Sequence, residues 1–323
     1  MRLRGLYLLT LLLVALPFIF PDNYYVTVVG VTAAVHAILA MSLNLLMGYA
    51  GQISLGHAAF FGMGAYASAL LTTRWDWPPL LAMLFGLIFT AVVAYLISRP
   101  ILRLKGHYLA MATLGFGIIV NIILVQAGEY TGGPDGLSDI PVLALFGWEI
   151  DSDLRWYGVM MAAVLLVLWL NLNLIHSRMG RALRALHTSE FAAETMGINT
   201  TATKSTIFVT SAVIAAAAGS LFAHQQSFVS PGSFSFFFSI ELVTMVVLGG
   251  LASTYGAIFG AIVITFLPEL LVVFEDYEVM IFGAILMLTM IFLPQGIYVV
   301  VEQRLLRWWQ KCWLQSGESG GAT

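Results

Sequence analysis

Charged residues and cysteine are scarce in this sequence. Only 10% of the 323 residues are charged and 60% are hydrophobic, and the mean hydropathy is +0.91. A soluble domain carries about 25% charged and about 45–50% apolar residues, so the composition excludes an ordinary soluble protein. The single cysteine, Cys312, excludes an intrachain disulfide and any metal cluster built on cysteines.

The motifs of several enzyme classes are also missing. The sequence has no GxxxxGKS/T phosphate loop, so the chain is not expected to hydrolyse nucleotides itself. It has no HExxH or CxxC motif either, and no GxSxG motif within its apolar runs, which leaves an intramembrane enzyme without a visible metal site or nucleophile. We therefore expect a non-catalytic chain that holds no cofactor and no metal ion.

Long apolar runs dominate the sequence. Each approaches the ~20 residues that an α-helix needs to cross a bilayer. Backbone groups in lipid must bond internally, and continuous apolar runs favour helices over a closed barrel. The predicted fold is an all-α polytopic membrane protein with about ten transmembrane helices, of which the shorter ones are tilted, broken or re-entrant. The expected spans are 6–20, 24–46, 57–73, 78–98, 107–126, 156–175, 205–223, 237–251, 256–274 and 279–293.

The basic residues are distributed unevenly between the connecting segments. With the N-terminus placed inside, all 14 lysines and arginines except Arg74 and Arg155 fall on the inner side. This positive-inside asymmetry predicts that both termini are cytoplasmic. Acidic residues gather instead in the outer segments 129–153 and 275–278. These segments form either a docking face for a soluble partner or ordinary solvated loops.

The chain is predicted to contain two parts. Residues 1–301 form a transmembrane domain that includes a cytoplasmic loop at 176–204. Residues 302–323 begin with tryptophans beside basic residues, which is typical of an interfacial helix, and end in a polar, glycine-rich tail that we expect to be disordered. The apolar run after Arg2 and Arg4 has no clear small-residue cleavage site, so we expect it to be retained as the first span, with cleavage as a signal peptide as the alternative.

The loop at 176–204 is the longest polar interruption of the chain. It opens with Arg178, Arg181 and Arg184, and an alanine-rich helix is predicted at 189–196, ended by Gly197. The alanines, with Phe191 and Met196, are expected to form a small hydrophobic plug for a soluble partner, in which the aromatic ring contributes most. The alternative is a plain surface helix that joins two spans.

Polar side chains within apolar runs are candidates for a transport pathway, because they are costly at membrane depth unless they face protein or water. Gln52, Ser54 and His57 lie in a segment rich in small residues. They either line a cavity or belong to a tight helix–helix contact in which their polar groups are satisfied. Glu241 is either a pathway residue or an acid that favours the first turn of its helix.

Several of these segments together resemble one transporter family. They are GRALRAL and EFAAETMGIN in the central loop, SLNLLMGYAGQISLGHAAFFGMGAYA at 42–67, TGGPDGL at 131–137, and SFVSPGSFSF followed by MVVLGGLASTYGAIFGA. In this order they are similar to the M-type permease subunit of branched-chain amino-acid ABC importers. The central loop departs from the EAA motif of other importer families, because the usual spacing is not kept beyond Gly197.

The resemblance implies a multi-pass permease of the bacterial inner membrane. Its partners would be a second homologous permease, two cytoplasmic ATPase subunits that bind ATP, and a periplasmic substrate-binding protein. The residues implied to couple to the ATPase are Ser189, Glu190, Phe191, Ala192, Ala193, Glu194, Met196 and Gly197. Related permeases leave urea, amides and aromatic acids as alternative substrates. A stand-alone secondary transporter is the remaining rival, and it leaves the long basic loop unexplained.

Overall fold

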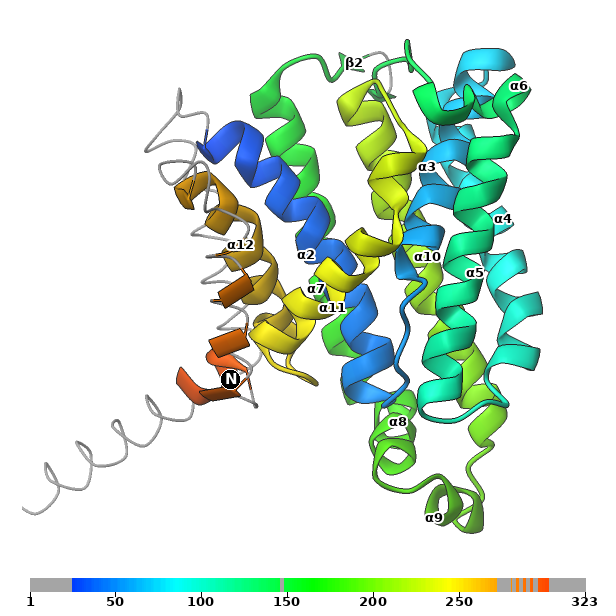
Figure 1. The fold of residues 1–323 in the computed structure, drawn as a ribbon, viewed down its shortest axis with the longest axis vertical. Coiled ribbons are helices and arrows are strands. Elements are labelled where there is room, and N and C mark those ends of the chain that lie inside the picture. Colours follow the sequence, from blue (N-terminus) through cyan, green and yellow to red (C-terminus); the bar gives the residue numbers. More distant parts are fainter. Residues whose placement is uncertain are drawn as a thin grey trace, which may run out of the picture.

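The computed structural model describes residues 25–145 and 148–271 and, farther along, residues 280, 283–284, 287–288, 291–292 and 296–301. It is a bundle of helices (Figure 1). The longer helices are α2 (Gly30–Asn44), α3 (His57–Arg74), α4 (Pro79–Ile101), α5 (His107–Gln126), α7 (Asp153–His176), α8 (Arg178–Thr188), α10 (Thr200–Gln226), α11 (Phe236–Gly249) and α12 (Thr254–Leu271).

Short elements connect these helices. They are the π-helices η1 (Tyr25–Val29) and η2 (Leu45–Tyr49), the helices α6 (Gly128–Thr131) and α9 (Glu190–Thr195), and the 3₁₀-helices η3 (Gly133–Asp135) and η4 (Pro231–Phe234). One antiparallel hairpin, β1 (Ala144–Leu145) with β2 (Trp148–Glu149), interrupts the helical pattern. The predicted helical fold is confirmed.

Five described helices are long and apolar enough to cross a membrane: Thr27–Tyr49, Pro79–Ile101, His107–Gln126, Asp153–His176 and Thr200–Gln226. Each coincides with an expected span. The expected spans at 57–73, 237–251 and 256–274 correspond to α3, α11 and α12, of which α11 has only 14 residues. The first expected span, most of the last one and the tail at 302–323 lie outside the described residues.

Helix α4 shows how such helices pack without a hydrophobic driving force from water. A small residue lies at every fourth position of its buried face, at Ala82, Gly86, Thr90, Ala94 and Ser98. This stripe lets α4 approach α3 and α10 closely, as small residues do in membrane bundles. Its other faces expose leucine, isoleucine and phenylalanine side chains, which suit lipid or another apolar surface.

Two irregular segments reach the middle of the bundle from opposite ends (Figure 1). Residues 50–56 follow η2, and α3 begins where they end; residues 227–235 follow α10, and α11 begins where they end. The two starts are in contact, because the Ala58 amide donates a hydrogen bond to Ser239 Oγ at 3.2 Å. The ring of Phe61 also lies 5.5 Å from that of Phe238. Both helices therefore begin inside the protein.

Candidate functional site

Helices α8 and α9 protrude from one end of the bundle, and α6 and β2 lie at the opposite end (Figure 1). Ser177 caps α8 by accepting a hydrogen bond from the Met179 amide at 3.1 Å. Within α8, Leu183 and Leu186 are buried, whereas the three arginines are exposed. These arginines are Arg178, Arg181 and Arg184. The arginine spacing of three thus places all three charges toward solvent.

Helix α9 begins and ends where the sequence predicted. The Ser189 hydroxyl accepts a hydrogen bond from the Ala192 amide at 3.3 Å and caps the helix. Gly197 adopts a left-handed φ of 80°, and its amide bonds the Glu194 carbonyl at 2.9 Å. Glycine suits this C-terminal position because it has no Cβ to clash there. The local structure is confirmed, and the contact with an ATPase remains a prediction.

One face of α9 is fixed to the rest of the chain by its carboxylates. Glu190 binds Lys204 of α10 at 2.6 Å and Lys105, which precedes α5, at 3.3 Å. Glu194 accepts a hydrogen bond from the Thr200 hydroxyl at 2.7 Å. Glu190 therefore joins α9 to two other parts of the bundle. The basic residues of these segments were predicted to lie on the inner side, but nothing in the sequence identified them as partners of Glu190.

The charge state of Glu190 follows from this arrangement. Partial burial favours the neutral acid, but the hydrogen bond and charge of Lys204, and then those of Lys105, outweigh burial and lower the pKa of Glu190. The Lys204 side chain is only 9% exposed and that of Lys105 is 76% exposed. The Lys204 pair is thus the better shielded from solvent, and Glu190 is held as a carboxylate.

The opposite face of α9 is exposed. Phe191 is 77% exposed and Met196 is 81% exposed, and Ala192 is exposed beside them. Ala193 is different, because it is only 1% exposed and packs inward. The expectation that all the alanines share the plug is therefore wrong for Ala193. A six-residue helix turns through less than two full turns, so adjacent alanines fall on different faces.

The candidate pathway residues Gln52, Ser54 and His57 lie together in and after the irregular segment before α3, and all are buried. His57 Nε2 lies 2.6 Å from Ser42 Oγ of α2. Within the described part of the chain, Gln52 Oε1, Ser54 Oγ and His57 Nδ1 have no hydrogen-bond partner. The sequence had not singled out Ser42, although a serine within an apolar run is a usable signal. That these residues line a transport pathway stays a prediction.

Glu241 lies in the second turn of α11 and is half-buried. It is the sixth residue of that helix, so the alternative of an acid in the first turn is not what the structure shows. It makes no ion pair with any residue that the structure describes. The contact between Ala58 and Ser239 places the α11 start next to the α3 start.

The protruding helices contact the segment that carries Gln52 and Ser54. Gly51 has φ of 66°, and a Cβ added there would lie 2.7 Å from Cδ2 of His187, in α8. The ring of His187 therefore lies against Gly51, although both residues are exposed. The same end of α8 leads directly into Ser189 and α9. The contact between His187 and Gly51 thus connects α8, and α9 after it, to the segment that leads into α3.

Comparisons with known proteins identify relatives over most of the chain. A family model described as "Branched-chain amino acid transport system / permease component" matches residues 25–290. The high-affinity branched-chain amino acid transport system permease protein LivM of Salmonella typhimurium is 35% identical over 98% of this chain and 79% of its own length. LivM of Escherichia coli is 34% identical over 94% and 76%. LivH of Salmonella typhimurium is 26% identical over 83% and 92%. No solved structure is significantly similar to the chain.

Proposed function

The chain belongs to the family of branched-chain amino acid transport system permease components, and we propose on that basis that it is a transmembrane permease subunit of a binding-protein-dependent ABC importer for these amino acids. The observation that carries the proposal, beside the family, is α9. One of its faces is fixed to the bundle through Glu190, and the other presents Phe191 and Met196 at the end of the molecule. Such a helix fits a groove on a soluble partner.

The proposed assembly contains this chain, a second permease, two cytoplasmic ATPase subunits and a periplasmic binding protein. LivM and LivH relatives support a pair of permeases. The other partners follow from the family. ATP binds to the ATPase subunits, and this chain contributes no catalytic group and needs no cofactor. We place it in the bacterial inner membrane, with ten spans, both termini cytoplasmic, a permease domain at 1–301 and a cytoplasmic tail at 302–323.

The contacts suggest how movement is passed on. Closure of the ATPases would displace α9 through Phe191 and Met196. Glu190 would carry the displacement to Lys204 and α10, and His187 would carry it to Gly51 and the α3 start. Gln52, Ser54 and His57 hold unpaired polar atoms there, and these atoms would gain partners when the helices separate and substrate or water enters. This gives an alternating-access step driven from outside the chain.

Reconstitution tests the function. Proteoliposomes that contain both permeases and the ATPases, with binding protein and leucine outside and ATP inside, should take up leucine. Glu241→Gln should slow uptake while the complex assembles normally, because it removes a half-buried carboxylate from the second turn of α11. Competition by urea, an amide or an aromatic acid tests the alternative substrates. Uptake by this chain in the absence of ATPases would show that it is a secondary transporter instead.

A further inference from the structure

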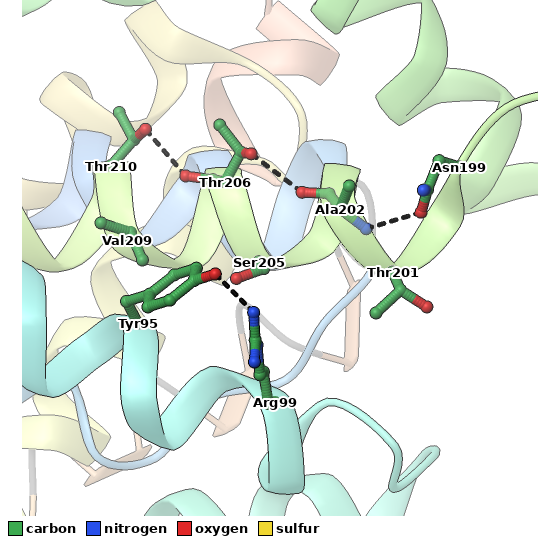
Figure 2. Close-up of a pocket in the computed structure, with 9 residues that line it drawn as sticks. All are labelled: Tyr95, Arg99, Asn199, Thr201, Ala202, Ser205, Thr206, Val209 and Thr210. Atoms are coloured by element: carbon green, nitrogen blue, oxygen red, sulfur yellow. Dashed lines mark hydrogen bonds between the residues drawn. The ribbon is translucent and has the colours of Figure 1, made fainter.

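A groove of about 620 Å³ lies between α4 and the first half of α10, at the end of the bundle that carries α8 and α9. Figure 2 shows Tyr95 and Arg99 on α4, which face Thr201, Ser205 and other residues of α10 across it. It belongs neither to α9 nor to the segment around His57. The function proposed above leaves it unused.

Among the residues that the structure describes, Arg99 is the only charged one that lines the groove. Its Nη2 donates a hydrogen bond to the Tyr95 hydroxyl at 2.6 Å, and its guanidinium lies 5.0 Å from the centre of the Tyr95 ring. Both contacts fix its position with neutral partners. No carboxylate among the described residues pairs with Arg99. A guanidinium has five N–H donors, so Arg99 keeps the capacity to bind an anion through two parallel hydrogen bonds.

The α10 side of the groove changes in character along its length. At its start, the Asn199 side chain caps the Ala202 amide at 2.9 Å, and the first turn of α10 adds partial positive charge. Farther along, the hydroxyls of Thr206 and Thr210 each bond a carbonyl of their own helix at 2.8 Å. Their hydrogen-bonding capacity is thus used locally, next to Val209. One end of the groove suits an anion, and the other suits an apolar chain.

We propose that this groove binds the headgroup and upper acyl chain of an anionic phospholipid of the phosphatidylglycerol class. Arg99 would bind the phosphate, with the Thr201 hydroxyl and the α10 start beside it, and the acyl chain would lie along Val209. In the described part of the chain no carboxylate lines the groove to receive an ammonium, which disfavours zwitterionic lipids. The exposed apolar face of α4 gives lipid direct access. In the proposed topology the groove opens to the cytoplasmic leaflet, where basic pockets between helices recognise anionic headgroups.

Native mass spectrometry of the purified permease–ATPase complex, titrated with phosphatidylglycerol or phosphatidylcholine, tests the proposal. We expect the complex to prefer phosphatidylglycerol. Arg99→Gln should weaken this binding roughly tenfold, as expected for the loss of hydrogen bonds to a charged group. The matched control is Arg181→Gln, which removes an exposed arginine of α8 at the same end and should leave binding unchanged.

Further arms distinguish a lipid from a free anion. Val209→Phe should fill the apolar end and weaken phosphatidylglycerol binding, without altering any binding of inorganic phosphate. Equal effects of Arg99→Gln and Arg181→Gln would overturn the proposal. So would displacement of the lipid by millimolar inorganic phosphate together with a silent Val209→Phe, which would indicate a free-phosphate site. Binding by the isolated chain but not by the complex would show that a partner subunit covers the groove, and would also overturn it.

Discussion

Gly51 lies in the segment before α3, at the point where this segment contacts His187 of the protruding helix α8. Its φ of 66° is in the left-handed region, where a side chain is strained by about 1–2 kcal/mol. A methyl group there would also press on the His187 ring. We therefore expect Gly51→Ala to lower the melting temperature of the purified complex and to reduce ATP-driven uptake. Adding His187→Ala to Gly51→Ala should restore only the share of the melting temperature that is lost through the clash with the His187 ring, because the strain of the left-handed φ remains.

The matched control is Gly115→Ala. Gly115 lies within α5, and no atom of the described residues lies within 4 Å of the position of an added Cβ. Because alanine is a better helix former than glycine by about 1 kcal/mol, this variant should be neutral or slightly stabilising. If both alanines had the same effect, the contact between Gly51 and His187 would have no special importance.

The Glu190 pair gives a prediction for pH. Because the pKa of Glu190 is lowered in the folded chain, its pairing stabilises α9 above the ordinary value of 4.5, and this stabilisation is lost as pH falls through the lowered pKa. The melting temperature of the wild type should therefore exceed that of Glu190→Gln at pH 7 and at pH 5.5. The difference should shrink only below pH 4.5.

Two lysine variants distinguish the partners of Glu190. Lys204→Met should lower the melting temperature more than Lys105→Met, because Lys204 is nearly buried and its pair is less screened by solvent. Thermal scans of the two variants side by side measure this. A larger effect of Lys105→Met would mean that the exposed pair is the main anchor of α9.

At the scale of the element, α9 presents two faces with different roles. Phe191→Ala and Ala192→Asp change the exposed face, and we expect both to reduce ATPase association without affecting expression. Loss of an aromatic anchor typically lowers binding by about 2 kcal/mol or more when it is a hot spot. Pull-down of the ATPase from detergent extract measures the association. Ala193→Asp would instead bury a charge within this chain and should lower expression itself.

Phe237→Ala is the control for Phe191→Ala. Phe237 is 78% exposed, close to the exposure of Phe191, but it lies at the start of α11 and not on the protruding helices. It should leave ATPase association unchanged. Full ATPase retention by both Phe191→Ala and Ala192→Asp would place the ATPase contact elsewhere.

The sequence predicted elements better than it predicted contacts. Apolar runs located the long helices because lipid requires each span to satisfy its own backbone, and Ser189 and Gly197 located α9 because caps act locally. Three features depend on contacts with segments that are distant in sequence: the burial of Ala193, the pairing of Glu190 with Lys204 and the contact of His187 with Gly51. No spacing rule for a single helix contains that information.

At the scale of the whole molecule, the order of helices along the chain constrains orientation. The segment between α5 and α7 and the segment between α7 and α10 lie at opposite ends of the bundle (Figure 1). The first contains most of the acidic residues predicted outside, and the second contains the basic loop predicted inside. The positive-inside asymmetry and the fold thus agree on which segments share a side, and charge alone assigns that side to the cytoplasm.

Cysteine labelling decides the assignment. In a Cys312→Ser background, Ser138→Cys and Thr195→Cys introduce single thiols at exposed positions of the two ends. Thr195 is a better site than Ser189, because Ser189 is half-buried and caps α9. A membrane-impermeant maleimide should label Ser138→Cys in spheroplasts, and should label Thr195→Cys only after lysis. Labelling of both from the same side would contradict the bundle itself, because α7 crosses between them. Labelling of Thr195→Cys alone in spheroplasts would keep the bundle and invert it, which would place α9 out of reach of a cytoplasmic ATPase.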